Sequence, residues 1–191
     1  MNRRGVIRIV PVLLLILAGG CERWFGPEKS GEIQLSSQLF GSESYYLFGF
    51  GYEQAEYYRY PYQGEPVPDI INEAYRMIEG GEVKVLPGFN IPPKVSGFAL
   101  VGFALVGEFP TLAEARSFYD DYKEVEEGLQ FEIVSDTVEL FQVWIQQTYL
   151  GNYVKLLVKD INTLQGESGD LYSEVVMEYV YQSDGTPEFP D

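Results

Sequence analysis

The feature that most constrains the fold is a set of alternating segments in the last third of the chain. From residue 172 to residue 181, apolar side chains recur at every second position with glutamates between them: Val175, Met177, Tyr179 and Tyr181 against Glu174 and Glu178. Because successive side chains of a strand point to opposite faces, this spacing predicts a strand with one buried face. Strands of this kind are typical of antiparallel sheets.

Neighbouring segments extend the predicted sheet. Phe141–Tyr149 and Tyr153–Ile161 have the composition of strands and flank Gly151-Asn152, a pair typical of tight turns. Apolar residues at 129, 131 and 133 also alternate with polar ones, which predicts a further strand at residues 129–133. The last third is therefore expected to be antiparallel sheet.

One helix is predicted at residues 111–122. Thr111 and Glu114 form a capping box, in which each side chain can satisfy a free N–H of the first helical turn. Apolar residues then recur at helical spacing. We expect the helix to pack through these residues: Leu112, Ala115 and Tyr119.

The first half of the chain is predicted to supply shorter strands. Glu32–Phe40 and Ser44–Tyr52 flank a turn at residues 41–43, and Ala55–Tyr60 follows as another strand. Residues 69–86 fit either a helix, from the spacing of their apolar residues, or a hairpin around adjacent glycines, and the hairpin is favoured.

A tandem repeat, GFALV-GFALV-G, occupies Gly97–Gly107. The run is too short to cross a bilayer, and we expect a buried central strand with a bulge at Gly102. With the segments above, this predicts an α+β fold: a single domain over residues 32–191, dominated by antiparallel sheet, with one helix at about 111–122.

The first twenty residues have the features of a secretory signal peptide. Met1–Val10 carries three arginines and no acid, and Ile9–Gly20 is an uncharged apolar run of 12 residues. A membrane-spanning helix needs about 20 such residues, so a shorter run behind a basic head indicates a signal peptide. The run ends in Leu17-Ala18-Gly19-Gly20-Cys21, and Cys21 is the only cysteine of the chain.

This ending resembles the lipobox of bacterial lipoproteins, which consists of an aliphatic residue, two small residues and a cysteine. Ala18 stands where leucine is usual, with Leu17 one step earlier. The resemblance implies a diacylglyceryl group on the Cys21 thiol and cleavage just before Cys21. Glu22 replaces the aspartate that retains such proteins at the inner membrane, which implies the outer membrane. An ordinary cleaved signal and an uncleaved anchor are the alternatives.

The charge of the chain bears on its partners. Removal of residues 1–20 takes away three arginines and no acid, which changes the net charge from −16 to −19. That charge repels nucleic acids and anionic head groups. We therefore expect no nucleic-acid partner and attachment to the membrane through acyl chains on Cys21. Residues 21–31, rich in polar residues, are expected to form a tether between lipid and domain.

Tyr45–Tyr62 is the densest aromatic segment, with nine aromatic residues in eighteen. Successive side chains of a strand point to opposite faces, so we expect one ring of each adjacent tyrosine pair to face the core and the other solvent or a partner. An ordinary core-and-rim role for these rings is the alternative. The candidate ligand-binding residues are Tyr45, Tyr46, Tyr57, Tyr58 and Tyr60.

Several kinds of chemistry are excluded by residue content. The chain has no histidine and a single cysteine, which excludes imidazole-based catalysis, histidine-ligated metals or haem, and internal disulfides. It also lacks phosphate-binding glycine-rich motifs, a nucleophile elbow and a calcium loop. We expect no enzyme activity, cofactor or metal. A glycan hydrolase based on paired carboxylates is an alternative.

A second resemblance lies in the C-terminal half. Gln142-Val143-Trp144, Gly151–Val158 and Glu178–Thr186 look like the final strands of HmuY-like lipoproteins of Bacteroidota, over about 50 of the 191 residues. Those proteins are β-rich surface lipoproteins, some of which bind haem. The resemblance implies architecture and location and carries no binding residue, because paired histidines are missing here.

These observations predict a membrane-anchored cell-envelope lipoprotein with a non-enzymatic binding or structural role. The first alternative is a lipoprotein that binds haem or another small ligand through the Tyr45–Tyr62 aromatics. The second is the carboxylate-based hydrolase.

Overall fold

The structure, a computed structural model, describes residues 29–42, 44–61, 66–92 and 101–190. Within these residues it is mostly antiparallel β-sheet with a single helix, as the sequence predicts. The predicted signal peptide, Cys21 and residues 97–100 of the first GFALV copy lie outside the described residues. No helix in the described part has the length and apolar character that crossing a membrane requires.

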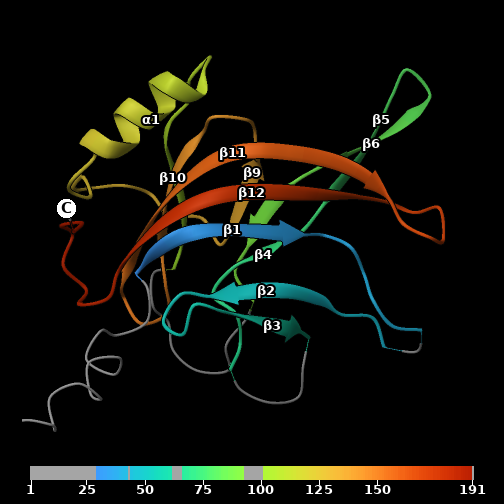
Figure 1. Cartoon of the computed structure of the whole chain (residues 1–191), viewed down its shortest axis with the longest axis horizontal. Coiled ribbons are helices and arrows are strands. Elements are labelled where there is room, and N and C mark those ends of the chain that lie inside the picture. Colours follow the sequence, from blue (N-terminus) through green and yellow to red (C-terminus); the bar gives the residue numbers. More distant parts are fainter. Residues whose placement is uncertain (1–28, 43, 62–65, 93–100, 191) are drawn as a thin grey trace, which may run out of the picture.

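A five-stranded antiparallel sheet forms the centre of the domain, in the order β1-β12-β11-β10-β8 (Figure 1). Its longest strands, β11 and β12, form a curved hairpin. The bounds are β1 Ser30–Ser36, β12 Leu171–Gln182, β11 Tyr153–Gln165, β10 Val143–Gln147 and β8 Gly102–Gly107. The predicted strands at 141–149, 153–161 and 172–181 are thus confirmed in type and approximate position.

Strand β12 has the one-sided burial that its alternation predicts. Met177 lies opposite Ile33 of β1 and Val158 of β11, and all three are almost fully buried. The residues between them face the other side of the sheet, where Glu178 joins an ion-pair network. The alternation in sequence therefore selects which face of the sheet forms the main core.

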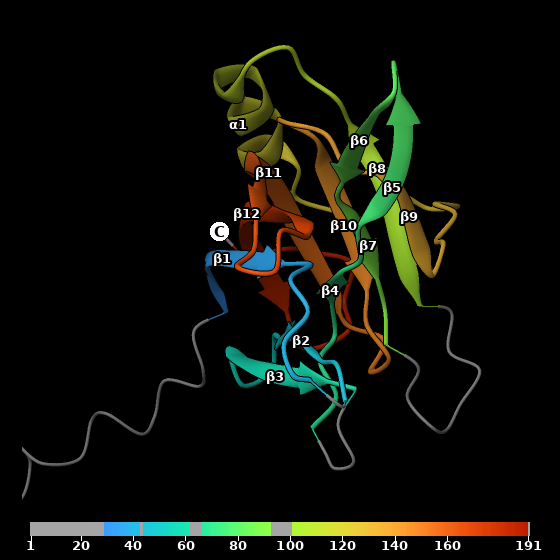
Figure 2. The same ribbon diagram turned by 90° about the vertical axis from the view of Figure 1, so that its right-hand side faces the viewer.

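Three smaller units accompany the main sheet, two of which cover this core face. They are the β2–β3 ribbon, the β4-β7-β9 sheet and the β5–β6 hairpin, of which only the ribbon and the small sheet contribute residues to the main core cluster. The bounds are β2 Leu47–Gly51, β3 Glu56–Tyr60, β4 Ile71–Asn72, β5 Tyr75–Glu79, β6 Glu82–Leu86, β7 Gly88–Asn90 and β9 Val134–Thr137. Figure 2 shows the small sheet and helix α1 on opposite sides of β11 and β12.

Helix α1, Leu112–Asp121, packs on the other face of the main sheet. The Thr111 side chain accepts a hydrogen bond from the backbone N–H of Glu114 at 3.3 Å, so the predicted N-cap is confirmed. Ala115 and Tyr119 are buried against the sheet as predicted. The expected contribution of Leu112 is wrong, because this residue lies in the first turn and is 37% exposed.

Strands β1 and β2 do not form the hairpin that the turn at 41–43 suggests. Strand β1 pairs along its length with β12, and β2 pairs with β3. Only one bridge, between Phe40 and Tyr46, joins the two flanks of the loop. Strand β1 also begins at Ser30, within the segment expected to be tether.

The second copy of the GFALV repeat forms β8, which lies at the edge of the main sheet and not at its centre. A Cβ atom at Gly102 would lie 2.5 Å from the backbone oxygen of Glu132, so glycine permits this close approach of two chain segments. The pairing irregularity is not at Gly102 but near Val106, which the register with β10 skips.

The hairpin favoured at residues 69–86 is confirmed in β5 and β6. Gly80 and Gly81 both have positive φ, 62° and 90°, as a two-residue turn of this kind requires. The strand expected at 129–133 is wrong in position. That segment contributes only a bridge between Glu132 and Phe103, and the strand begins at Val134.

Candidate functional site

A groove of about 770 Å³ lies at the end of the main sheet where β1 ends and β11 turns into β12. Three chain segments far apart in sequence line it: residues 37–47, which connect β1 to β2, residues 72–76, which lead from β4 into β5, and residues 166–172 of the β11–β12 turn. The pairing of β1 with β12 brings the first and third segments together, and Asn72 joins the second to them by hydrogen bonds to the backbone oxygens of Leu35 and Ser173.

Asn72 is the most deeply placed of the residues that line the groove. It is fully buried, and its Nδ2 donates to the backbone oxygens of Ser173 at 3.0 Å and Leu35 at 3.3 Å. Its Oδ1 accepts no hydrogen bond from any described residue. An unsatisfied buried acceptor costs about 1–3 kcal/mol. The oxygen is itself shielded from solvent.

The rim of the groove is exposed and partly aromatic. Tyr45 is 61% exposed and Leu39 is 59% exposed, although both are large side chains that could have been buried. Tyr172, from the opposite wall, is half-buried. Exposed apolar surface around a concave site is the usual appearance of a binding surface.

The charged residues of the groove have both signs. Arg76 is an exposed cation, and Glu73 and Asp170 are exposed carboxylates. Asp170 accepts a hydrogen bond from the Ser168 hydroxyl at 2.9 Å, and Glu73 accepts one from Asn90. These contacts orient the carboxylates but leave the groove open to polar ligands.

Of the predicted tyrosines, only Tyr45 lines the groove. Tyr46 packs against Phe40 and Phe48 at ring-centroid distances of 5.8 and 5.7 Å, and the Arg59 guanidinium lies 4.8 Å from its ring centroid. The ring of Tyr46 thus belongs to a small aromatic cluster at the start of the β2–β3 ribbon.

The remaining predicted tyrosines lie on β3, outside the groove. Tyr57 is 47% exposed, yet its ring packs on the core residue Phe50 at 5.1 Å and its hydroxyl accepts from the backbone N–H of Gln34 at 2.9 Å. Tyr58 and Tyr60 are half-buried. None of the five tyrosines is fully buried. In the first pair Tyr45 is exposed while Tyr46 packs in the aromatic cluster, and in the second pair the Tyr57 ring packs on the core residue Phe50 although nearly half of the residue is exposed.

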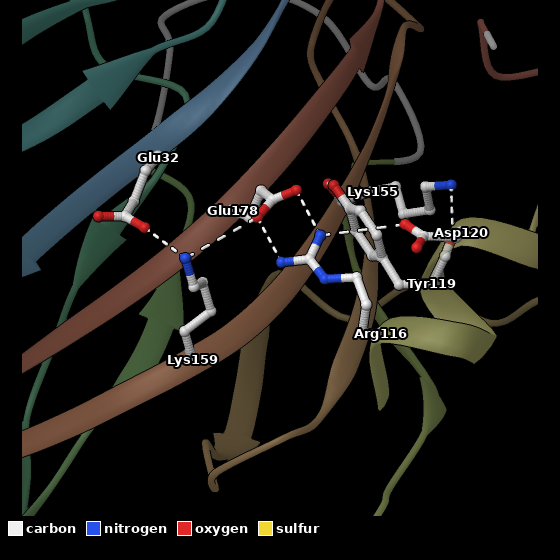
Figure 3. Close-up of polar contacts among 7 residues, drawn as sticks. All are labelled: Glu32, Arg116, Tyr119, Asp120, Lys155, Lys159 and Glu178. Carbon is white, nitrogen blue, oxygen red and sulfur yellow. Dashed lines mark hydrogen bonds and ion pairs between the residues drawn. The ribbon is translucent and has the colours of Figure 1, made fainter. Parts of the chain in front are cut away.

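A second polar cluster lies on the helix side of the main sheet (Figure 3). Arg116 of α1 makes two parallel hydrogen bonds of 2.5 Å to the Glu178 carboxylate on β12. Lys159 of β11 bridges Glu178, at 3.9 Å, and Glu32 of β1, at 2.5 Å. The Arg116 hydrogen bonds lower the pKa of Glu178 below its usual range. This network fastens the helix and β1 to the central hairpin.

Lys155 is a buried lysine beside this network, only 4% exposed. Its Nζ donates to the backbone oxygens of Tyr119 at 2.6 Å and Tyr122 at 2.7 Å, at the C-terminal end of α1. The Phe189 ring covers it at 5.2 Å. Burial, followed by the nearby positive charge of Lys123, lowers the pKa of Lys155 to about 8. Because its donors satisfy carbonyls at the end of the helix, Lys155 caps α1 and is not available as a reactive amine.

The described residues contain no cluster of three or more acidic or other ligand side chains that could hold a metal ion. The polar groups of the groove are instead hydroxyls, amides and separate charges. Such a set can form hydrogen bonds with a ligand in both directions.

Sequence reasoning missed most of the groove. Asn72, Arg76 and Tyr172 were not singled out, because each comes from a different segment with no shared motif. One signal was available: Asn72 interrupts an apolar run after Ile70-Ile71, and a polar residue at a buried strand position requires hydrogen-bond partners.

No protein-family model matches the chain, and no curated protein sequence gives a significant match.

Proposed function

We propose that the chain is a lipid-anchored binding protein of the bacterial cell envelope, acylated on Cys21 and held in the outer membrane. Its α+β domain binds a ligand in the groove between residues 37–47, 72–76 and 166–172, without enzymatic activity. The observation that carries this proposal is the groove itself. It combines an exposed aromatic ring, Tyr45, with a lining of polar and charged side chains from three separate chain segments.

The position of the groove fits an anchored protein. Strand β1 begins at Ser30, within the segment expected to be tether, and ends at Ser36, directly before the groove. Seven residues of strand span about 20 Å. An anchor joined to the chain before Ser30 therefore enters the domain at the end of β1 that is opposite the groove.

The anchor is tested by replacing Cys21 with serine in the natural host. The wild-type protein should incorporate labelled palmitate and sediment with membranes. Cys21→Ser should incorporate no label, because the thiol is the acylation site, and should either leave the membrane fraction or stay unprocessed. Label in the serine variant would refute lipidation at Cys21.

The groove is tested by mass spectrometry of small molecules that copurify with the full-length protein. Tyr45→Ala should lower the amount of the copurifying molecule. Tyr57→Ala is the matched control, because Tyr57 is similarly exposed but lies outside the groove. Equal loss from both variants would place the ligand on the β2–β3 ribbon and contradict the groove.

A glycan hydrolase is the second candidate, because two carboxylates, Glu73 and Asp170, line the same groove. Carboxylate pairs are the usual catalytic groups of glycoside hydrolysis. If the protein releases shorter sugars from oligosaccharides, and Glu73→Gln and Asp170→Asn each abolish release, the non-enzymatic proposal is wrong.

A further inference from the structure

We infer that the ligand of the groove is an uncharged oligosaccharide. This inference rests on the proposed function, since it names the class of ligand for the same groove. It depends on three properties of the described residues: an exposed aromatic rim, a lining of neutral hydrogen-bonding groups, and an electrostatic environment unsuited to anions.

The aromatic rim matches the shape of a sugar ring. A pyranose presents an apolar C–H face, and a tyrosine ring offers a flat apolar surface with a polar tip. Tyr45 is 61% exposed at the rim, and Tyr172 is half-buried in the lining. These residues come from different loops, so a chain of linked sugars could contact both.

The lining matches the hydroxyl groups of a sugar. Each sugar hydroxyl donates one hydrogen bond and accepts others, and it is best bound by side chains that can do both. The groove has three serine hydroxyls and two side-chain amides: Ser37, Ser42, Ser168, Gln38 and Asn72. Within the protein, Ser37 bonds Ser173, Ser168 donates to Asp170 and the Asn72 nitrogen donates to backbone oxygens. The match to a sugar therefore rests on Ser42, Gln38 and the acceptor side of the Ser168 hydroxyl.

The charges favour a neutral ligand. The chain carries a net charge of −16, and the groove itself contains two carboxylates, Glu73 and Asp170, against one cation, Arg76. An anionic sugar polymer would meet repulsion from the whole protein as well as from the groove. The volume of about 770 Å³ lies within the usual range of ligand pockets, roughly 300–1,000 Å³.

The test is calorimetric titration of the full-length protein in a detergent without sugar groups. The probes are maltohexaose, cellohexaose, laminarihexaose and hexa-N-acetylchitohexaose, with hexagalacturonate as the anionic counterpart and an uncharged hexapeptide as the non-sugar counterpart. We expect at least one neutral hexasaccharide to bind and hexagalacturonate not to bind.

Variants link binding to the groove. Tyr45→Ala should lower the affinity for the neutral hexasaccharide about tenfold, which corresponds to about 1.4 kcal/mol. Tyr45→Phe should bind it like the wild type, because this variant keeps the ring. Tyr57→Ala should have no effect. Circular dichroism and thermal unfolding of each variant establish that it is folded before binding is compared.

The outcomes separate the ligand class from the proposed function. If the hexapeptide binds in a Tyr45-dependent way and no sugar does, the groove is a binding site but the glycan inference is overturned. If hexagalacturonate binds as tightly as the neutral sugars, the electrostatic argument is wrong. If no hexasaccharide binds to the folded protein, the inference is overturned, while the copurification experiment still tests the groove.

Discussion

Replacement of Tyr52 by phenylalanine should destabilise the domain by an amount that the buried contacts define. Tyr52 directly follows β2 and is fully buried, and its hydroxyl donates to the Gln146 side-chain oxygen at 2.9 Å. Gln146 is also fully buried, and its Nε2 donates to the backbone oxygen of Asp69 at 2.7 Å. Burial raises the pKa of Tyr52 well above its ordinary value, so the hydroxyl remains a donor. The chain of contacts joins β2 to β10 across the core.

The expected magnitude follows from what the substitution removes. Tyr52→Phe keeps the ring and its packing against Phe50 and Tyr179, so the cavity left is small. It leaves the Gln146 oxygen buried without its donor, which costs about 1–3 kcal/mol. Taking about 2 kcal/mol and a urea m-value of about 2 kcal/mol/M, the unfolding midpoint should fall by about 1 M.

Equilibrium urea unfolding, followed by tryptophan fluorescence and by circular dichroism, measures this change. Tyr45→Phe is the control, because it removes the same atom from an exposed ring and should shift stability by less than about 0.5 kcal/mol. An unchanged midpoint in Tyr52→Phe would refute the reasoning. A loss of stability no larger than that of Tyr45→Phe would also refute it, because the Gln146 oxygen would then have another hydrogen-bond donor.

Three further predictions concern the helix side of the sheet. Thr111→Ala should cost about 1 kcal/mol through loss of the N-cap, measured by urea unfolding, and no loss would place the helix start elsewhere. The pKa of Lys155 is lowered to about 8 in the folded protein, so above pH 8 the unfolded chain binds more protons than the folded one. The free energy of unfolding should therefore rise from about pH 8 to about pH 9.5, where the tyrosines of the unfolded chain have not yet ionised. Lys155→Met should flatten that rise in unfolding curves recorded across the same pH range, and an equal rise in the variant would assign it to another group. A double-mutant cycle of Arg116→Ala and Glu178→Ala should give a coupling of about 1 kcal/mol near pH 7. Because the pKa of Glu178 is lowered, this coupling should be lost as the pH falls below about 4, and a coupling that persists in acid would contradict the ion pair.

Local patterns were sufficient to predict several elements of this fold. Thr111 caps the helix because its side chain needs only a backbone N–H three residues away. Gly80 and Gly81 form the turn between β5 and β6 because the required positive φ angles depend on these two residues alone. The buried face of β12 follows from period-two alternation. In each case the deciding interaction is short in sequence.

Strand pairing could not be predicted in the same way. Strand β1 pairs with β12, far along the chain, and not with the nearby β2, because its apolar residues Ile33 and Leu35 complete the core beside Met177 and Val175. The loop between β1 and β2 has the features of a turn but does not determine its partners. The edge position of β8 has a similar origin, since an apolar run identifies a buried segment but not its neighbours in the sheet.

The sequence by itself therefore determined the long strands of the main sheet, where the helix begins and which face of the last strand is buried. Only the tertiary structure decided the groove, because residues 37–47, 72–76 and 166–172 meet through the pairing of distant strands. It also decided that Tyr45, among five similar tyrosines, is the one at the rim, while Tyr57 packs on the core residue Phe50. The physical reason is that a side chain's exposure depends on what other segments cover it, and composition and spacing do not contain that information.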